Sequence, residues 1–397
     1  VGIGMGAEKT LTLEGKKAFD EAELLIGAKR MTDAVQRPGQ MVLHEYRSDK
    51  IVEYIKTHPQ YRTVAIALSG DVGFYSGARK LMDLLDGDVQ VICGISSVVY
   101  FMAKIGLSWD DARIVSAHGR DCNLIALIRH NPKVFSILGT EDGVARLASR
   151  LVAYGMGDVT LYVGENLSYE NEKIFHASAA ELTEYRGDAL SVVTACNEKA
   201  VPLPAVHGIC DEEFLRGKAP MTKEEVRTVS LSKLRLQEDS VCYDVGAGTG
   251  SVSVEMALRA WKGQVYAIEK KEDALALLKE NRRKFATDNL EIVPGTAPEA
   301  MVELPVPTHA FIGGSSGNMN EIIRLLLDKN PGVRIVINCI TLETVTEAMN
   351  AIRDFSLTDV DIVQLSAARS KSIGRYHMMM GENPIYIISC SGRGEEI

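Results

Sequence analysis

The chain has 397 residues, which is enough for two or three domains of ordinary size. Hydrophobic residues make up 46% and charged residues 24%, and the net charge of −9 argues against a large non-specific nucleic-acid surface. No apolar run reaches the length of a membrane span and no signal peptide is visible, so we expect no membrane partner. Seven cysteines, none of them in a C-x-x-C pair, predict a cytoplasmic protein without a metal site.

The first half alternates predicted strands and helices, which indicates an α/β domain. Residues 1–6 are typical of the end of a strand and a glycine turn, and we expect the natural chain to start a few residues upstream. One helix is predicted at 11–20, and a second follows the loop at 70–76 and ends at about residue 85. Apolar runs predict strands at 22–27, 63–69, 89–93, 112–116, 134–138, 159–163 and 190–194. The loops after the strands carry Gly, Ser, Asp and Arg, and open α/β sheets bind ligands in such loops.

Residues 197–222 are rich in proline and glycine and have no clean period. We therefore predict domains at 1–200 and 222–397, joined by a connector at 201–221. After a helix at 223–234, strands are predicted at 241–244, 264–269, 290–293, 308–312, 333–338, 360–366 and 384–389. Five β-α steps that close with two consecutive strands are the seven-stranded order of Rossmann-like methyltransferases. Residues 367–377 are interpreted as a loop between the last two strands.

A glycine-rich stretch lies at the first strand of this second unit. The strand ends in Asp244, and glycines follow at alternate positions up to Gly250. A dinucleotide fingerprint would have its third glycine where Ser251 stands, and a P-loop would need a lysine. The next strand ends in Glu269, where an acid can bind ribose hydroxyls. The pattern resembles the S-adenosylmethionine site of Rossmann-like methyltransferases, and the alternative is a glycine turn without a ligand.

The first 200 residues resemble the tetrapyrrole methylase family. Its three signatures are matched by the glycine opening, by Leu68–Tyr75 and by Gly94–Ser97, although Met5, Val72 and Cys93 replace the usual prolines. Two further segments resemble the branch that methylates precorrin at carbon 5, and these are Ala117–Arg120 and Gly164–Ser168.

The second half resembles the decarboxylating precorrin methyltransferases that act at carbon 15. The matching segments are Pro220–Arg227, Gly295–Glu299 and Phe311–Ser315. Both halves in one chain resemble the bifunctional precorrin-6Y C5,15-methyltransferase family of cobalamin biosynthesis. The resemblance implies a two-lobed tetrapyrrole methylase fold followed by a seven-stranded Rossmann-like methyltransferase domain. It also implies a precorrin-6 type substrate, one S-adenosylmethionine site in each half and a homo-oligomer.

The resemblance implies specific site residues in each half. In the second half the cofactor residues are Thr222, Asp244, Gly246, Ala247, Gly248, Thr249, Gly250, Glu269, Gly295, Thr296 and Ala297. In the first half they are Gly70, Asp71, Val72, Gly73, Ser96 and Ser97. Candidates for contact with substrate carboxylates are His118, Arg120, Arg369, Lys371, Arg375 and His377. Structural interpretations stand beside these roles: Thr222 as a helix N-cap, Asp71 as a turn residue and residues 367–377 as a solvated loop.

Three alternatives remain open from the sequence. Relatives of both halves modify RNA, and an RNA methyltransferase would need a basic face or an RNA-binding module. A nicotinamide oxidoreductase is disfavoured by Ser251. A chain with one working half and one structural half is the third alternative. The sequence does not decide the order of the two methylations or whether the macrocycle already carries cobalt.

Overall fold

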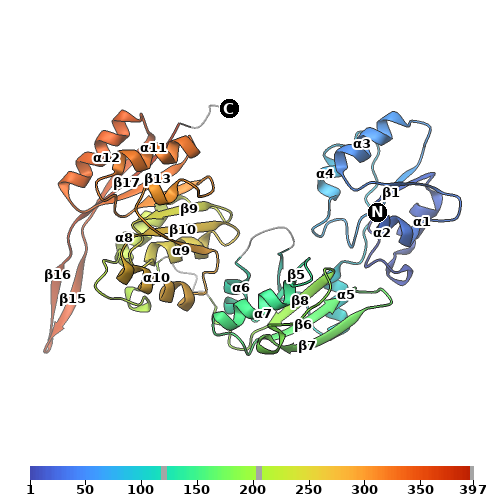
Figure 1. The fold of residues 1–397 in the computed structure, drawn as a ribbon, viewed down its shortest axis with the longest axis horizontal. Coiled ribbons are helices and arrows are strands. Elements are labelled where there is room, and N and C mark those ends of the chain that lie inside the picture. The colour runs from blue at the N-terminus through green and yellow to red at the C-terminus, as the bar shows by residue number, and fades with distance from the viewer. Residues whose placement is uncertain (118–122, 203–207, 394–397) are drawn as a thin grey trace. The chain divides into compact units, whose positions relative to one another are not determined.

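The computed structural model describes residues 1–117, 123–202 and 208–393 (Figure 1). The chain divides into two compact units. The first comprises 1–120 and 131–201, and the second comprises 121–130 and 202–397. Among the described residues, no helix is long and apolar enough to cross a membrane.

The first unit begins with a three-stranded parallel sheet of order β2-β1-β3. Its elements are η1 (Glu8–Thr10), α1 (Leu13–Glu21), β1 (Leu24–Gly27), α2 (Lys29–Val35), β2 (Met41–His44), α3 (Ser48–Thr57), β3 (Val64–Ile66) and α4 (Ala78–Met82). The strand predicted at 89–93 is wrong, because the segment has no strand pairing and Ile92 accepts only one backbone hydrogen bond, from Gly2 at 2.9 Å. Only Ile92 in this segment is buried, and Val91 is 51% exposed.

A mixed five-stranded sheet, of order β4-β5-β8-β6-β7, completes the first unit. Its elements are α5 (Ser97–Ile105), β4 (Arg113–Ser116), β5 (Lys133–Ile137), α7 (Gly143–Ala153), β6 (Thr160–Glu165), β7 (Lys173–Ser178), η2 (Ala179–Leu182) and β8 (Ser191–Cys196). The predicted strands at 112–116, 134–138, 159–163 and 190–194 are confirmed within a few residues. Two separate sheets in this unit agree with the expected two-lobed architecture.

The second unit is built on a seven-stranded sheet of order β11-β10-β9-β12-β13-β17-β14. All neighbours pair in parallel except β17, which is antiparallel to β13 and β14. Its strands are β9 (Val241–Val245), β10 (Gln264–Glu269), β11 (Leu290–Pro294), β12 (His309–Ile312), β13 (Arg334–Cys339), β14 (Thr358–Leu365) and β17 (Ile385–Ser391). Its helices are α6 (Leu124–His130), η3 (Asp211–Glu213), α8 (Glu224–Leu234), α9 (Ser251–Arg259), α10 (Glu272–Lys284), η4 (Glu299–Met301), α11 (Met319–Lys329) and α12 (Leu342–Asp354). The predicted seven-stranded order is confirmed.

The loop predicted at 367–377 is wrong, because this segment belongs to an antiparallel hairpin of β15 (Ala368–Ile373) and β16 (Tyr376–Gly381). Figure 1 shows the hairpin projecting from the rest of the second unit. Both of its faces are largely exposed, so its strands lack the apolar alternation that marks a half-buried strand. Cross-strand pairing therefore organises residues whose sequence resembles a polar loop.

Candidate functional site

The glycine turn between β9 and α9 is closely packed, and its backbone geometry explains the glycines. Gly246, Gly248 and Gly250 have φ of +76°, +56° and +79°, in the left-handed region that favours glycine. A Cβ on Gly250 would lie 2.0 Å from the Leu278 Cδ1, and one on Gly248 would lie 2.8 Å from the Pro220 carbonyl oxygen. The turn thus exposes backbone at the carboxyl end of β9, which is the edge of the sheet where ligands bind in this fold.

Asp244 lies directly beneath the turn and is fully buried. Ser253 donates a hydrogen bond to its Oδ2, whereas its Oδ1 has no partner. Burial raises the pKa of this carboxyl to about 7, the Ser253 hydrogen bond opposes the rise, and the charge of Glu269 adds to it. The hydroxyl of the neighbouring Thr249 is also buried without a partner. Unpartnered buried polar atoms are costly, so their presence at this turn marks a binding site.

Glu269 ends β10 and closes the other side of the turn. Its Oε2 accepts from the Gly248 N–H at 2.8 Å, and its Oε1 accepts from the N–H groups of Lys270 and Lys271 at 2.8 and 2.9 Å. A carboxylate has about four acceptor positions, so the three backbone donors leave capacity for a ligand hydroxyl. The carboxylate is therefore held at a fixed position beside the glycine turn.

A cavity of about 210 Å³ opens at this edge of the sheet. Six of the predicted residues line it: Gly246, Gly248, Glu269, Gly295, Thr296 and Ala297. Asp244, Ala247, Thr249, Gly250 and Thr222 do not line it. The cavity wall also contains residues that the sequence analysis did not single out: Ala219, Pro220, Lys270, Lys271, Ser315 and Ser316. Pro220 and Ser315 lie in quoted family segments, which was the signal available for them, and the two lysines directly follow Glu269.

The donor set fits S-adenosylmethionine. Asp244 does not line the cavity, but its unpartnered carboxylate oxygen beneath the turn favours a cationic group bound there. Glu269 has spare acceptor capacity for ribose hydroxyls, and the glycine turn lacks the Cβ atoms that would fill the site. Thr222 does not act as the N-cap, because α8 begins after Lys223 and the Thr222 carbonyl instead accepts from Arg227 at 2.6 Å. The structural interpretation of Thr222 as the cap is therefore wrong.

In the first unit, the three predicted loops meet around Asp71. Gly4 and Gly70 exchange backbone hydrogen bonds at 3.1 and 2.9 Å. The Asp71 carboxylate accepts from the Gly73 N–H at 2.8 Å and from the Gly94 N–H at 3.1 Å. Asp71 is thus at least a turn residue that ties two loops together. Ser96 caps α5 by accepting from the Val99 N–H at 3.5 Å, and Ser97 is the first residue of that helix.

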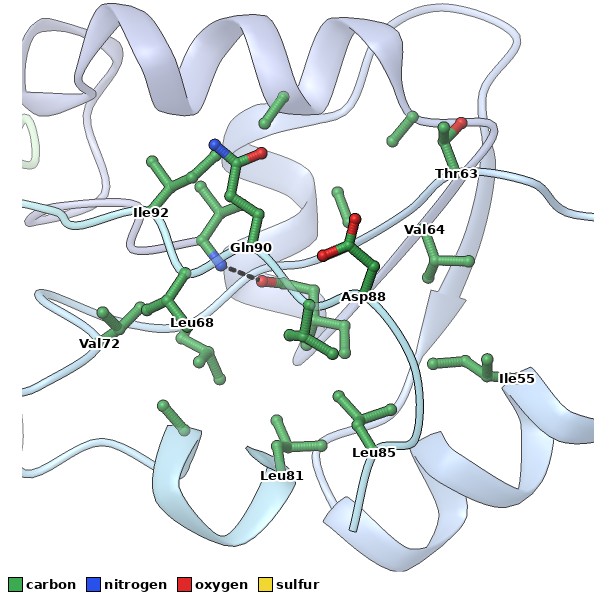
Figure 2. A pocket seen from close by; sticks show the side chains of 18 of the residues that line it. Ile55, Thr63, Val64, Leu68, Val72, Leu81, Leu85, Asp88, Gln90 and Ile92 are labelled. Carbon is green, nitrogen blue, oxygen red and sulfur yellow. Dashed lines mark hydrogen bonds between the residues drawn. The ribbon is translucent and has the colours of Figure 1, made fainter. Parts of the chain in front are cut away.

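A larger cavity, of about 710 Å³, also lies in the first unit. Figure 2 shows Val64 of β3 and Ile92 on its opposite sides, with Leu81 and Leu85 along its lower wall. Of the predicted first-half cofactor residues, Val72 alone lines it. This space, whose wall carries both aliphatic and charged side chains, therefore does not coincide with the loops around Asp71, and the cofactor residues of the first half stay predictions.

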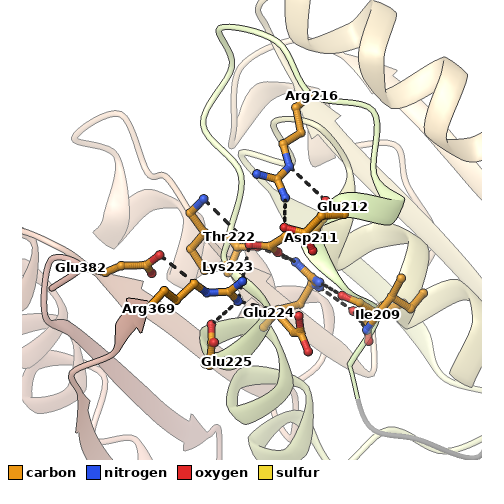
Figure 3. A network of polar contacts seen from close by, with 12 residues as sticks. Ile209, Asp211, Glu212, Arg216, Thr222, Lys223, Glu224, Glu225, Arg369 and Glu382 are labelled. Carbon is orange, nitrogen blue, oxygen red and sulfur yellow. Dashed lines mark hydrogen bonds and ion pairs between the residues drawn. The ribbon is translucent and has the colours of Figure 1, made fainter. Parts of the chain in front are cut away.

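The candidates for substrate contact fall into two groups. His118 and Arg120 lie outside the described residues. Arg369, Lys371 and His377 lie on the strands of the hairpin and Arg375 lies at its turn. The Arg369 guanidinium is engaged by Glu225 at 2.8 Å, with Asp211, Glu224 and Glu382 within 4 Å (Figure 3). Arg369 therefore binds the hairpin to α8, and substrate contact by these residues stays a prediction.

The fold and the site together define a Rossmann-like methyltransferase. A family model described as a precorrin methyltransferase domain matches residues 213–391, and one described as tetrapyrrole (corrin/porphyrin) methylases matches residues 1–183. A probable cobalt-precorrin-6B C(15)-methyltransferase (decarboxylating) of Pyrobaculum calidifontis is 44% identical over 47% of this chain and 96% of its own length. A cobalt-precorrin-6B C(15)-methyltransferase (decarboxylating) from Salmonella typhimurium is 42% identical over 45% of this chain and 94% of its own length.

The chain belongs to the decarboxylating precorrin methyltransferase family through its second half, and a tetrapyrrole methylase half precedes it. Among solved structures, a precorrin-6Y C5,15-methyltransferase from Geobacter metallireducens is 40% identical, with a TM-score of 0.44 over 46% of this chain and 95% of its own. The two curated relatives are named as precorrin enzymes, so neither the RNA-modifying nor the nicotinamide alternative is supported.

Proposed function

We propose that the chain methylates a precorrin-6 type tetrapyrrole at carbons 5 and 15 and removes carbon dioxide from the ring C acetate, with S-adenosylmethionine as methyl donor in each half. The observation that carries the proposal is the buried glycine turn with its unpartnered Asp244 oxygen, in a half that matches named C15-methyltransferases. The tetrapyrrole methylase match over 1–183 supports a second transfer by the first half. We assign domains 1–200 and 222–397 to the two reactions and 201–221 to the connector.

S-adenosylmethionine supplies a methyl group on an electrophilic sulfonium when it is bound. The second half would hold it with the glycine turn backbone, with Asp244 near its cationic end and with Glu269 at its ribose. Thr296 and Ala297, at the end of β11, would border its adenine. Methyl transfer to an electron-rich carbon mainly requires alignment, so fixed backbone and carboxylate positions are the relevant contribution of this chain.

The fixed position of Glu269 has a specific consequence for binding. Its carboxylate already organises three backbone N–H groups, so little reorganisation is needed when ribose hydroxyls bind. Charge-assisted hydrogen bonds of this kind are stronger than neutral ones. Loss of the carboxylate would therefore weaken the ligand contact and loosen the glycine turn together.

We also infer that the chain self-associates through the β15–β16 hairpin. Ile373, Tyr376, Met378 and Met380 are large apolar residues on one face of the hairpin, with 46–65% of their surface exposed. A two-stranded ribbon is marginally stable alone, and a cluster of exposed apolar side chains marks an association surface. Light scattering should show an oligomer that Met378→Lys dissociates, and a monomeric wild type would contradict the inference.

Product mass tests the function. The wild-type chain with a precorrin-6 type tetrapyrrole and S-adenosylmethionine should give a product that has gained two methyl groups and lost one carbon dioxide. A product with one methyl gained and no carbon dioxide lost would confine the activity to the first half. An unchanged substrate, in the presence of measurable S-adenosylmethionine binding, would contradict the substrate assignment.

A further inference from the structure

Residues 208–223, called the strap here, cross the glycine turn of the second unit. Ala219 and Pro220 of the strap line the cavity. The Pro220 carbonyl oxygen lies 2.8 Å from the position that a Cβ on Gly248 would occupy. The cavity, about 210 Å³, is smaller than the roughly 300–1,000 Å³ of a typical ligand site. The position of the strap therefore sets how much of the cofactor fits beside the turn.

Both ends of the strap meet at one fully buried side chain, that of Arg227 on α8. Its Nη2 donates to the Ile209 carbonyl, and its Nη1 donates to the Thr222 carbonyl at 2.6 Å. Ile209 lies near the start of the strap and Thr222 near its end, so a single guanidinium forms hydrogen bonds to both ends of the strap. The Phe214 ring, within the strap, packs 4.7 Å from the same guanidinium.

Two carboxylates neutralise Arg227. Asp211, in the strap, accepts from Nη1 at 3.2 Å, and Glu255, on α9, accepts from Nε at 2.5 Å. Glu255 also accepts from the Ile209 N–H at 3.1 Å. Because α9 begins at the glycine turn, Glu255 links the strap to the helix that carries the cofactor loop. A planar guanidinium with several divergent donors can make all these bonds at once, and an ammonium cannot.

The burial of this cluster is not explained by stability alone. The desolvation of a cation and two carboxylates offsets much of the free energy gained from their attraction. Apolar side chains of similar volume would often stabilise the fold equally well. The cluster instead fixes the position of the strap relative to α8 and α9, because each N–H donor of the guanidinium has its own acceptor. Asn281 adds a second tie, since its Nδ2 donates to the carbonyls of Leu215 at 3.1 Å and of Thr249 at 2.9 Å, joining the strap to the glycine turn.

We propose that Arg227 is a positioning residue for the cofactor site: it holds the strap in register over the glycine turn and thereby sets the affinity of the second half for S-adenosylmethionine. The inference rests on the proposed function and adds to it a residue that does not line the cofactor cavity. Because a change in cofactor affinity acts on the ground state and the transition state alike, loss of this positioning should raise KM and leave kcat nearly unchanged.

The test uses the full chain and the variant Arg227→Lys, which keeps the positive charge but loses the several divergent N–H donors of the guanidinium. KM for S-adenosylmethionine, measured by carbon dioxide release at saturating tetrapyrrole, should rise by about tenfold or more, with kcat within about threefold of the wild type. Hydrogen–deuterium exchange of strap amides should become faster. The control is Arg334→Lys: Arg334 is also buried and paired, with Asp359 at 2.7 Å, but it begins β13 at the opposite edge of the sheet.

An unchanged KM and unchanged strap exchange in Arg227→Lys would overturn the proposal, as would an equal KM effect from Arg334→Lys. If Arg227→Lys does not fold, Asp211→Asn decides by the same two readouts, because it keeps the volume and an acceptor while removing one charge. If the wild type releases no carbon dioxide, the proposed function fails, and strap exchange in the variants still tests whether Arg227 holds the strap.

Discussion

Asp244→Asn tests the buried carboxyl beneath the glycine turn. In the folded chain its pKa is about 7 because of burial, against an ordinary value of 3.8. Between these two values the folded state binds a proton that the unfolded state has released, so this residue lowers the stability as pH rises from about 4 to about 7. Below pH 4 both states are protonated and the effect is absent. Asparagine has nearly the same shape and no such titration.

The size of the effect follows from the shift. A shift of about three pKa units corresponds to about 4 kcal/mol at full development, and about 2–3 kcal/mol of it falls between pH 5 and pH 8. Denaturant unfolding of both proteins at these two pH values should therefore show that the wild type loses about 2–3 kcal/mol more than the variant. Subtracting the variant removes the contributions of the other titrating groups, which both proteins share.

Cofactor binding should show the opposite pH dependence. A cationic group beside Asp244 favours the ionised carboxylate, so the affinity of the wild-type second half for S-adenosylmethionine should rise by about tenfold from pH 6 to pH 8. The variant should bind more weakly and show no such rise. Equal pH dependence of stability in the two proteins would refute the assigned protonation behaviour of Asp244, and equal, pH-independent affinity would refute its role in binding.

Two further predictions concern stability. Gly250→Ala should lower the free energy of unfolding by about 2–3 kcal/mol, because φ is +79° and the new Cβ would lie 2.0 Å from the Leu278 Cδ1. The matched change Gly374→Ala, at φ +60° with nothing within 4 Å, should cost only about 1 kcal/mol, and equal melting temperatures would contradict the steric argument. Asn289→Leu should cost about 2–4 kcal/mol, because the buried Asn289 amide donates to the carbonyls of Ala257, Ala260 and Gly263, and an unchanged unfolding midpoint would count against this network.

The sheet of the second unit could be predicted because its central strands are buried on both faces. The run from Val241 to Asp244 and the run from Arg334 to Asn338 are buried or nearly so at every position, and such runs are visible in sequence. The apolar run at 89–93 was misleading because its residue types favour a strand, whereas only Ile92 in it is buried and the segment forms no strand pairing. The hairpin at 368–381 was missed because cross-strand pairing, and not burial, defines it.

The residues of the candidate site also fall into those that the sequence predicts and those that only the structure reveals. Asp244 and Glu269 were predictable because the first is the penultimate residue of β9 and the second ends β10, each in a fixed motif, and parallel strands bring these ends to one edge of the sheet. The contribution of Ala219 and Pro220 to the cavity was not, because it depends on how a proline-rich segment folds back over the glycine turn. The Arg227 cluster was also hidden, since its partners lie at 209, 211, 222 and 255 and only the tertiary structure brings them together.

The central claim is that one chain carries two separable methyl transfers. Glu269→Ala tests it most directly, because it removes the carboxylate that organises the second glycine turn and leaves the first unit untouched. The product mass from this variant should show one methyl group gained and no carbon dioxide lost. Retention of both methylations together with decarboxylation would contradict the account of the second site, and loss of both methylations in a folded variant would contradict the independence of the two halves.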